Sequence, residues 1–292
     1  MMMRAMVLMF AAVMIAAVVS GCANQRGRNG AVVERGAPPS YAEAAAAYNE
    51  RIAPLGRFRA QATVQFRYET QDGDERVEQP EGTIQIVRPD RLALSLGKLG
   101  QVKFWLGSDE ERYWWIDMLR DEPEAYVGRH DAFTKETERR LVLTLTPRSL
   151  IRVLCLTPMD VGAAGATQWS SDGLRLGIVT PLEGGGRQRV WVDPDNFSPV
   201  KSELYDAAGG LAFVVQMSGD ERVEVATGSV RGGSPWIPKS YSVFRPGEME
   251  PVARISLSGA KNSGVSDKAF EFETVVETYG VEVVRDVDRV RE

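Results

Sequence analysis

Residues Phe58–Tyr68 read FRAQATVQFRY, and this stretch decides the fold. Its even positions are apolar or aromatic, whereas its odd positions are arginine, glutamine or threonine. A strict period of two buries one face of a strand and exposes the other, which is typical of an antiparallel sheet. We therefore predict that the domain is built on a sheet with one apolar face.

The same alternation recurs on both sides of a charged central segment. Further strands are predicted near Ile84–Ile86, Leu92–Leu96, Val102–Leu106, Tyr113–Ile116, Leu174–Ile178, Val190–Val192, Val200–Tyr205, Leu211–Met217, Val223–Val225, Ile237–Phe244 and Ile255–Leu257. Short connections between them predict two meanders. The charged segment Asp117–Arg140 predicts a loop with helical pieces, and Val281–Glu292 fits either a surface helix or a frayed end.

Two helices are predicted as covers for the apolar face. Ser40-Tyr41-Ala42-Glu43 has the pattern of a capping box, which predicts a helix that ends near Ile52, before Pro54. Thr146-Pro147 fits the start of a second helix that continues to about Leu156. The fold class is therefore mainly β with helices (α+β), in which a strongly curved sheet is capped by two or more helices.

The amino terminus has the pattern of a secretory signal. The fifteen-residue apolar stretch Ala5–Val19 is short for a membrane span but suits a signal peptide. Val19-Ser20-Gly21-Cys22 then resembles a bacterial lipobox, with Val19 where leucine is usual. The resemblance implies cleavage before Cys22 and lipid attachment to it, and Ala23 favours the outer membrane; a plain secreted protein is the alternative.

Composition gives no support for catalysis or for nucleic-acid binding. The chain has a net charge of −5, two cysteines and a single histidine. These residues are too few for a thiolate–imidazole zinc site, and any histidine-dependent nucleophile would need His130, in a charged segment predicted to be exposed. Cys155 lies in an apolar run that predicts a buried structural thiol. We predict no catalytic residues, no metal and no cofactor.

Several segments together resemble the LolA- and LolB-like superfamily of lipoprotein carriers and receptors. They are the Leu55–Ala60 entry into the first strand, the helix over Thr146–Leu154, Val192-Asp193-Pro194, Glu203–Asp206, and the closing Phe270-Glu271-Phe272. The match extends from Ser40 to Phe272. It implies an unclosed antiparallel β-barrel whose concave apolar face, capped by helices, forms a cavity for acyl chains.

The resemblance also suggests site residues. The candidate cavity-lining residues are Phe58, Val64, Phe66, Leu94, Phe104 and Phe213, for which plain core packing is the alternative. The receptor branch carries a Pro-Leu-Gly loop with a protruding leucine that touches membrane. Lys98, Leu99 and Gly100 match that loop except for lysine in place of proline, and an ordinary exposed leucine is the alternative.

The predicted organisation is a signal peptide (1–21), a flexible tether (22–39), a LolA/LolB-like half-barrel domain (40–275) and a charged tail (276–292). The predicted function is a lipid-anchored protein of the outer membrane that binds acyl chains or lipidated cargo. Its expected partners are membrane lipid, a lipoprotein or lipid cargo, and a periplasmic carrier. The alternative is a structural or stress-sensing envelope lipoprotein with a filled core that acts by protein–protein contact.

Overall fold

The computed structural model describes residues 32–69, 75–119, 122–132, 147–182, 185–225 and 235–288. The strands are β1 (Arg57–Glu69), β2 (Glu75–Glu78), β3 (Glu81–Val87), β4 (Arg91–Lys98), β5 (Gln101–Ser108), β6 (Arg112–Asp117), β7 (Glu124–Arg129), β8 (Ala166–Trp169), β9 (Leu176–Pro181), β10 (Arg187–Val192), β11 (Pro199–Tyr205), β12 (Leu211–Arg222), β13 (Trp236–Phe244), β14 (Ala253–Lys261) and β15 (Val283–Asp286). The helices are α2 (Tyr41–Ile52), α4 (Pro147–Val153) and α5 (Phe272–Thr278), with short 3₁₀ turns η1 (Ala53–Leu55), η2 (His130–Ala132) and η3 (Asp267–Phe270).

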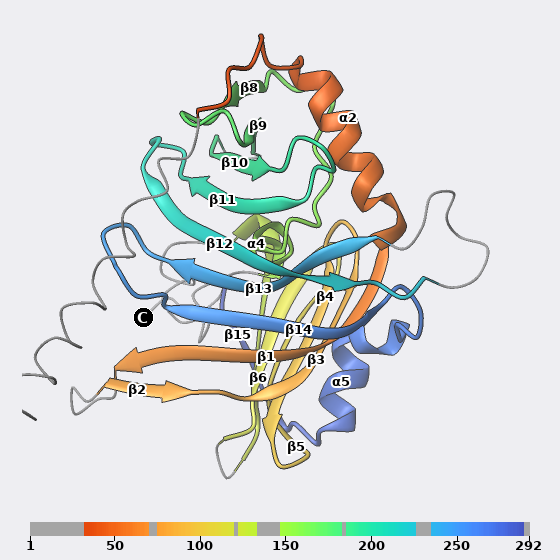
Figure 1. Cartoon of the computed structure of the whole chain (residues 1–292). Helices are drawn as coiled ribbons and strands as arrows, with labels where there is room; N and C mark the ends of the chain where they lie inside the picture. Colours follow the sequence, from red (N-terminus) through yellow and green to blue (C-terminus); the bar gives the residue numbers. More distant parts are fainter. Residues whose placement is uncertain are drawn as a thin grey trace, which may run out of the picture.

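All these strands belong to one sheet, in the order β15-β7-β6-β5-β4-β3-β1-β14-β13-β12-β11-β10-β9-β8, with β2 paired to β1 outside this path. The two predicted meanders are joined where β1 pairs antiparallel with β14, from the far end of the chain. The path ends at β15 and β8, so the sheet is curved but unclosed (Figure 1). The predicted fold class is therefore confirmed.

The predicted first helix is α2. Ser40 caps it as expected, because its side chain accepts from the Glu43 amide while the Glu43 carboxylate accepts from the Ser40 amide. The face that carries Tyr41, Tyr48 and Ile52 is buried against the sheet. No helix among the described residues has the length and apolar character needed to cross a bilayer.

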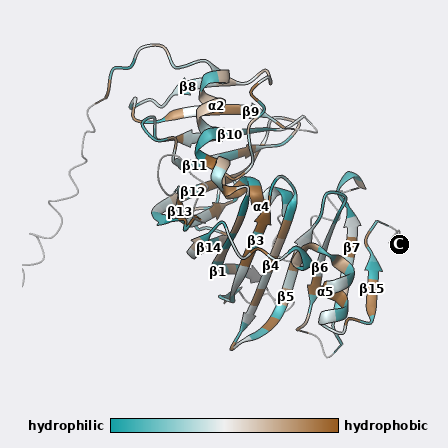
Figure 2. Cartoon of the chain, turned by 90° about the vertical axis from the view of Figure 1, so that its right-hand side faces the viewer, coloured by the Kyte–Doolittle hydropathy of each residue, from teal (hydrophilic) through white to brown (hydrophobic). Residues whose placement is uncertain are grey.

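The second predicted helix is α4, which packs against β4 and β5; Figure 2 shows it beside this half of the sheet. Its expected cap, Thr146, lies outside the described residues. The helix closes with a Schellman motif, in which the Leu156 amide donates to the Ile151 carbonyl and the Cys155 amide to that of Arg152. Cys155 adopts φ 54° at the position that is usually glycine, so its side chain is turned into the core.

Two segments differ from the expectation. Part of the charged segment Asp117–Arg140 is the strand β7 rather than a loop, and part of Val281–Glu292 is β15 rather than a surface helix. β15 pairs parallel with β7 and forms an edge of the sheet. Glu124 on β7 accepts from Arg285 on β15, at 2.8 Å, so charged side chains join the two strands. The charges that suggested a loop are part of this strand pairing.

The sheet has a second apolar cover on its convex face. η3 and α5 pack Phe270, Phe272 and Val275 against outward-facing side chains of β4–β7. These outward-facing residues are Ala93, Trp105, Trp114, Ile116 and Ala125. Because this part of the sheet is buried on both faces, the run Tyr113–Ile116 is apolar at every position, and each of its residues is at most 3% exposed. Ordinary strand packing therefore accounts for the aromatic run.

Candidate functional site

The concave face is a continuous apolar surface beneath α2 and α4. Phe58 is 0% exposed, and Val64 and Leu94 are each 2% exposed. They belong to one cluster with Ile52 of α2 and Ile151 of α4. The strand register explains the shared direction of their side chains, since every second residue of β1 faces the helices. These three candidate residues form the floor of the concave face.

The other three candidates lie at the margin of the same cluster. Phe66, Phe104 and Phe213 are only partly buried, and each packs against the cluster. Phe66 lies near the end of β1 and Phe213 near the start of β12, and both strand ends lie on the side of the molecule away from α2 (Figure 1). The structure therefore brings all six predicted residues to one face, three inside and three at the rim. That they line a cavity for a ligand stays a prediction.

Buried polar contacts hold α2 and α4 against the sheet. The Tyr48 hydroxyl on α2 donates to the Cys155 carbonyl, at 2.6 Å. The Gln188 amide on β10 donates to the Arg152 carbonyl, at 3.2 Å, and to the Ser202 hydroxyl, at 2.9 Å. Burial raises the pKa of the Cys155 thiol to about 12, so this thiol is neutral at ordinary pH. These polar contacts were not predicted from the sequence. Their signal is Gln188, a polar residue at an inward position of the apolar strand β10.

The Leu99 hairpin joins β4 to β5 away from the concave face. Leu99 is 103% exposed, with φ 54°, and Gly100 follows with φ 78°. Two successive positive φ values are typical of the tight turns that fit the twist of a β-hairpin. Lys98 pairs with Glu78 of β2, which ties the hairpin to a neighbouring strand. The hairpin borders an open hollow of ≈ 640 Å³ whose wall includes Gln61, Thr83, Ser95 and Gln101.

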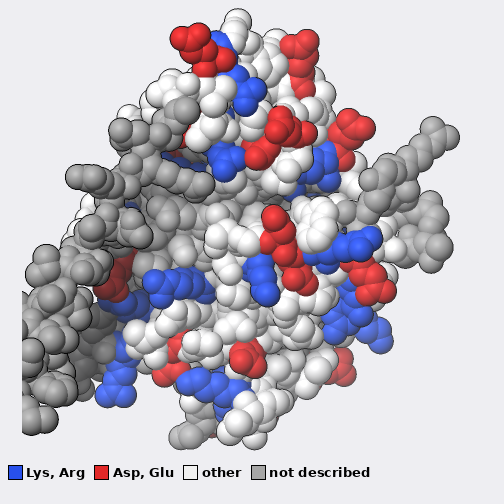
Figure 3. Space-filling view, viewed as in Figure 1, with Lys and Arg blue, Asp and Glu red and all other residues white. Residues whose placement is uncertain are grey.

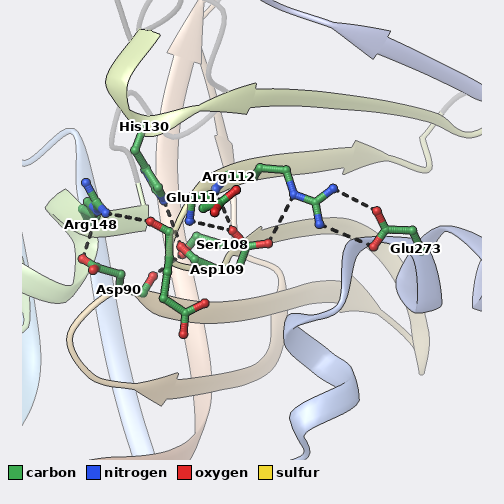
Figure 4. A network of polar contacts seen from close by, with 9 residues as sticks. Asp90, Ser108, Asp109, Glu111, Arg112, His130, Arg148 and Glu273 are labelled. Atoms are coloured by element: carbon green, nitrogen blue, oxygen red, sulfur yellow. Dashed lines mark hydrogen bonds and ion pairs between the residues drawn. The ribbon is translucent and has the colours of Figure 1, made fainter.

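His130 lies in a polar network rather than in open solvent (Figure 4). The sequence predicted an exposed histidine, but the ring is half-buried and its Nε2 lies 3.1 Å from the Asp109 carbonyl oxygen. Burial, together with the nearby Arg148 guanidinium, lowers its pKa. Arg148 itself forms an ion pair with Asp90, at 2.9 Å.

The same network extends to the convex cover. Arg112 donates to both carboxylate oxygens of Glu273 on α5, at 2.8 and 3.4 Å, and its Nε donates to Asp109, at 3.3 Å. Arg148 of α4 donates to the Glu110 carbonyl, at 3.1 Å, so the turn between β5 and β6 links α4 on one face to α5 on the other (Figure 4). The network therefore has a structural role, because it connects helices on opposite faces of the sheet.

The described residues hold no group of three or more His, Cys, Asp or Glu side chains placed to bind a metal ion. On the face shown in Figure 3, acidic and basic side chains are interspersed. Such mixing produces no extended field of one sign. Cys22, the predicted lipid-attachment residue, lies outside the described residues.

Comparison with known proteins gives similarity of structure only. No family model and no curated protein sequence matches the chain. A LolA superfamily protein from Nitrosomonas europaea is similar with a TM-score of 0.50 and 12% identity, over 81% of this chain and 99% of that one. A putative outer membrane lipoprotein-sorting protein domain from Vibrio parahaemolyticus follows at 0.48 and 12%, over 80% and 99%. A DUF1329 family protein from Desulfovibrio piger has 0.48 and 15%, over 80% and 96%.

The agreement with the first of these structures covers almost the whole of the smaller protein. It concerns the architecture described above, a single curved and unclosed sheet with helices on its concave side. At 12% identity it establishes the fold alone. The chain has a LolA-like fold.

Proposed function

We propose that this protein is a lipid-anchored envelope protein that binds acyl chains of a lipoprotein or another lipid on its concave face. One observation carries the proposal. Three partly buried phenylalanines, Phe66, Phe104 and Phe213, extend the apolar floor to its margin, where part of each residue is accessible to solvent. The LolA-like fold supports the proposal, since the resemblance to the LolA- and LolB-like proteins implies a concave apolar face that takes acyl chains.

The expected ligand is a long hydrocarbon chain. Each methylene removed from water contributes roughly 0.8 kcal/mol, whereas association costs at least about 4 kcal/mol in lost freedom. A chain of a few carbons therefore gains too little to bind, and one with about ten buried methylenes binds usefully. The partly buried rings of Phe66, Phe104 and Phe213 offer such a chain apolar contact at the margin of the cluster.

The anchor and the cellular location form part of the same proposal. The Cys22 motif would place the protein on the periplasmic face of the outer membrane, where lipidated cargo is at hand. The exposed Lys98-Leu99-Gly100 turn would then be a contact point for lipid or for a carrier protein.

A second candidate function rests on a different observation. Phe58, Val64 and Leu94 are at most 2% exposed beneath the helices, as in a filled core. A filled core favours a structural or sensing lipoprotein that acts through its surface. This candidate predicts a stable protein partner and no bound lipid.

Native mass spectrometry of a soluble form that begins at Ala23 tests the proposal. We expect co-purified lipid, and binding of fluorescent fatty acids that strengthens about 15-fold for every two added methylenes. Phe213→Glu should weaken this binding at least tenfold. Gln216→Glu, on the opposite face of the same strand, is the matched control and should leave it unchanged. Absence of lipid and of fatty-acid binding in the folded protein would refute the proposal and favour the second candidate.

A further inference from the structure

Residues 32–39, which we call the clamp segment, lie along the β8–β9 hairpin. The Val33 amide donates to the Asp172 carbonyl, at 2.9 Å, and the Trp169 indole N–H donates to the Gly36 carbonyl, at 2.8 Å. The Thr167 hydroxyl donates to the Pro39 carbonyl. The sequence predicted that these residues belong to a flexible tether (22–39), but the structure docks them on the sheet.

Two further contacts show that the docking is specific. The Arg35 guanidinium lies over the Trp169 ring, 5.0 Å from its centre, and its Nε donates to the Gly173 carbonyl, at 3.1 Å. Gly173 has φ 69°, and a Cβ there would lie 2.0 Å from the Val33 carbonyl oxygen. Only glycine permits this approach of the two backbones.

The clamp segment shortens the tether. Only nine residues, Ala23–Ala31, separate Cys22 from Val32, and a fully extended chain covers ~35 Å between those two residues. A compact domain of this size is roughly 45 Å across, from its expected radius of gyration. With the clamp segment docked, the β8–β9 end therefore stays near the lipid anchor, whereas release up to Ser40 extends the reach to ~60 Å.

The Leu99 hairpin lies at the other end of the molecule. Both views place β8 at one extreme, beside the start of α2, and β5 at the opposite one (Figures 1 and 2). The β8–β9 end also exposes apolar side chains close together, with Val32 68%, Leu174 42% and Val33 37% exposed. Exposed aliphatic residues beside a short lipid tether fit a bilayer surface.

We propose that the β8–β9 end, with Val32, Val33 and Leu174, is the surface that rests on the anchoring membrane. In this orientation the Leu99 hairpin, at the opposite end, points away from that membrane, and the docked clamp segment favours the orientation by keeping the β8–β9 end close to the anchor. This inference rests on lipidation of Cys22, which belongs to the proposed function, but it does not depend on what the concave face binds.

Fluorescence quenching on liposomes tests this orientation with the full lipidated protein. Single cysteines at Leu174, Leu99 and Met249, all exposed, carry a polarity-sensitive dye, while Cys22 is blocked by lipid and Cys155 is buried. With nitroxide-labelled phospholipid in the bilayer, we expect at least threefold stronger quenching at Leu174 than at Leu99 or at the control site Met249. Equal or stronger quenching at Leu99 overturns the proposal.

A clamp-release variant supplies the second arm. Thr167→Val with Trp169→Phe removes two donors to the clamp segment, and we expect quenching at Leu99 to rise toward that at Leu174. No change at Leu99 in a folded variant contradicts the role of the clamp segment. Failure of the protein to float with liposomes overturns both this inference and the anchor in the proposed function. Fatty-acid binding by the soluble form is measured separately, so loss of that activity alone leaves the orientation standing.

Discussion

Removal of the Phe272 ring should destabilise the protein strongly, because this ring joins α5 to the convex face. Phe272 is 7% exposed, and its ring centre lies 5.5 Å from that of Trp114. The Arg112 guanidinium lies 5.7 Å from the centre of the Phe272 ring. Truncation of a buried phenylalanine to alanine costs about 3–5 kcal/mol. We expect Phe272→Ala to lower the free energy of unfolding by about 3–4 kcal/mol, near the low end because the residue is not completely buried. The corresponding fall in Tm is roughly 10 °C.

Urea unfolding followed by tryptophan fluorescence measures this loss, since Trp114 reports on the same cluster. Glu273→Ala is the matched control on the next residue of α5. It removes the ion pair with Arg112, but the Glu273 side chain is 72% exposed, so its loss should cost under about 1 kcal/mol. If Phe272→Ala costs no more than Glu273→Ala, then α5 does not cover the convex face and the reasoning is refuted.

Three further predictions concern local features. The pKa of the Cys155 thiol is raised to about 12, so this thiol should resist thiol reagents at pH 8 until the protein unfolds. The thiol ionises at about pH 8.5 in the unfolded chain, which lowers the stability of the fold above that pH. Cys155→Ala should therefore reduce the loss of stability at alkaline pH. The pKa of His130 is lowered in the fold, so the neutral ring contributes stability that is present above pH ~6.5 and is lost as the pH falls through the folded pKa. The NMR signal of this single histidine should therefore titrate below pH ~6.5. His130→Gln should reduce the fall in Tm at acid pH. Ser40→Ala should cost about 0.5–2 kcal/mol in thermal unfolding, whereas Ser40→Asp, which keeps a side-chain acceptor for the Glu43 amide, should cost much less.

The elements that the sequence predicts well are those whose signal is local. The alternation in Phe58–Tyr68 specifies β1, and the Ser40–Glu43 capping box specifies the start of α2. In both cases a few consecutive residues determine the backbone, because strand periodicity and capping act over one or two turns. The six concave-face candidates share that advantage, since their inward direction follows from the alternation of their own strands.

The elements that the sequence misses depend on distant partners. β15 exists because Val283–Asp286 pairs with β7, and neither segment alternates strongly enough to predict the other. The convex cover is hidden for a similar reason. Tyr113–Ile116 lacks alternation because α5 buries the face that would otherwise be exposed to solvent. No local feature of the sequence indicates this helix, which lies more than 150 residues further along the chain. Local patterns report one-sided burial better than two-sided burial.

The clamp segment belongs to this second class, and it changes how the two ends of the molecule are interpreted. By composition, 22–39 is a flexible tether, and by motif Leu99 is a residue that touches membrane. Both interpretations follow from local sequence, and a tether as long as 22–39 would leave the domain free to turn either end toward the bilayer. Trp169 and Gly173 shorten that tether, because they dock residues 32–39 on the β8–β9 end. We therefore expect the β8–β9 end, rather than Leu99, to lie nearest the anchoring membrane while these hydrogen bonds hold.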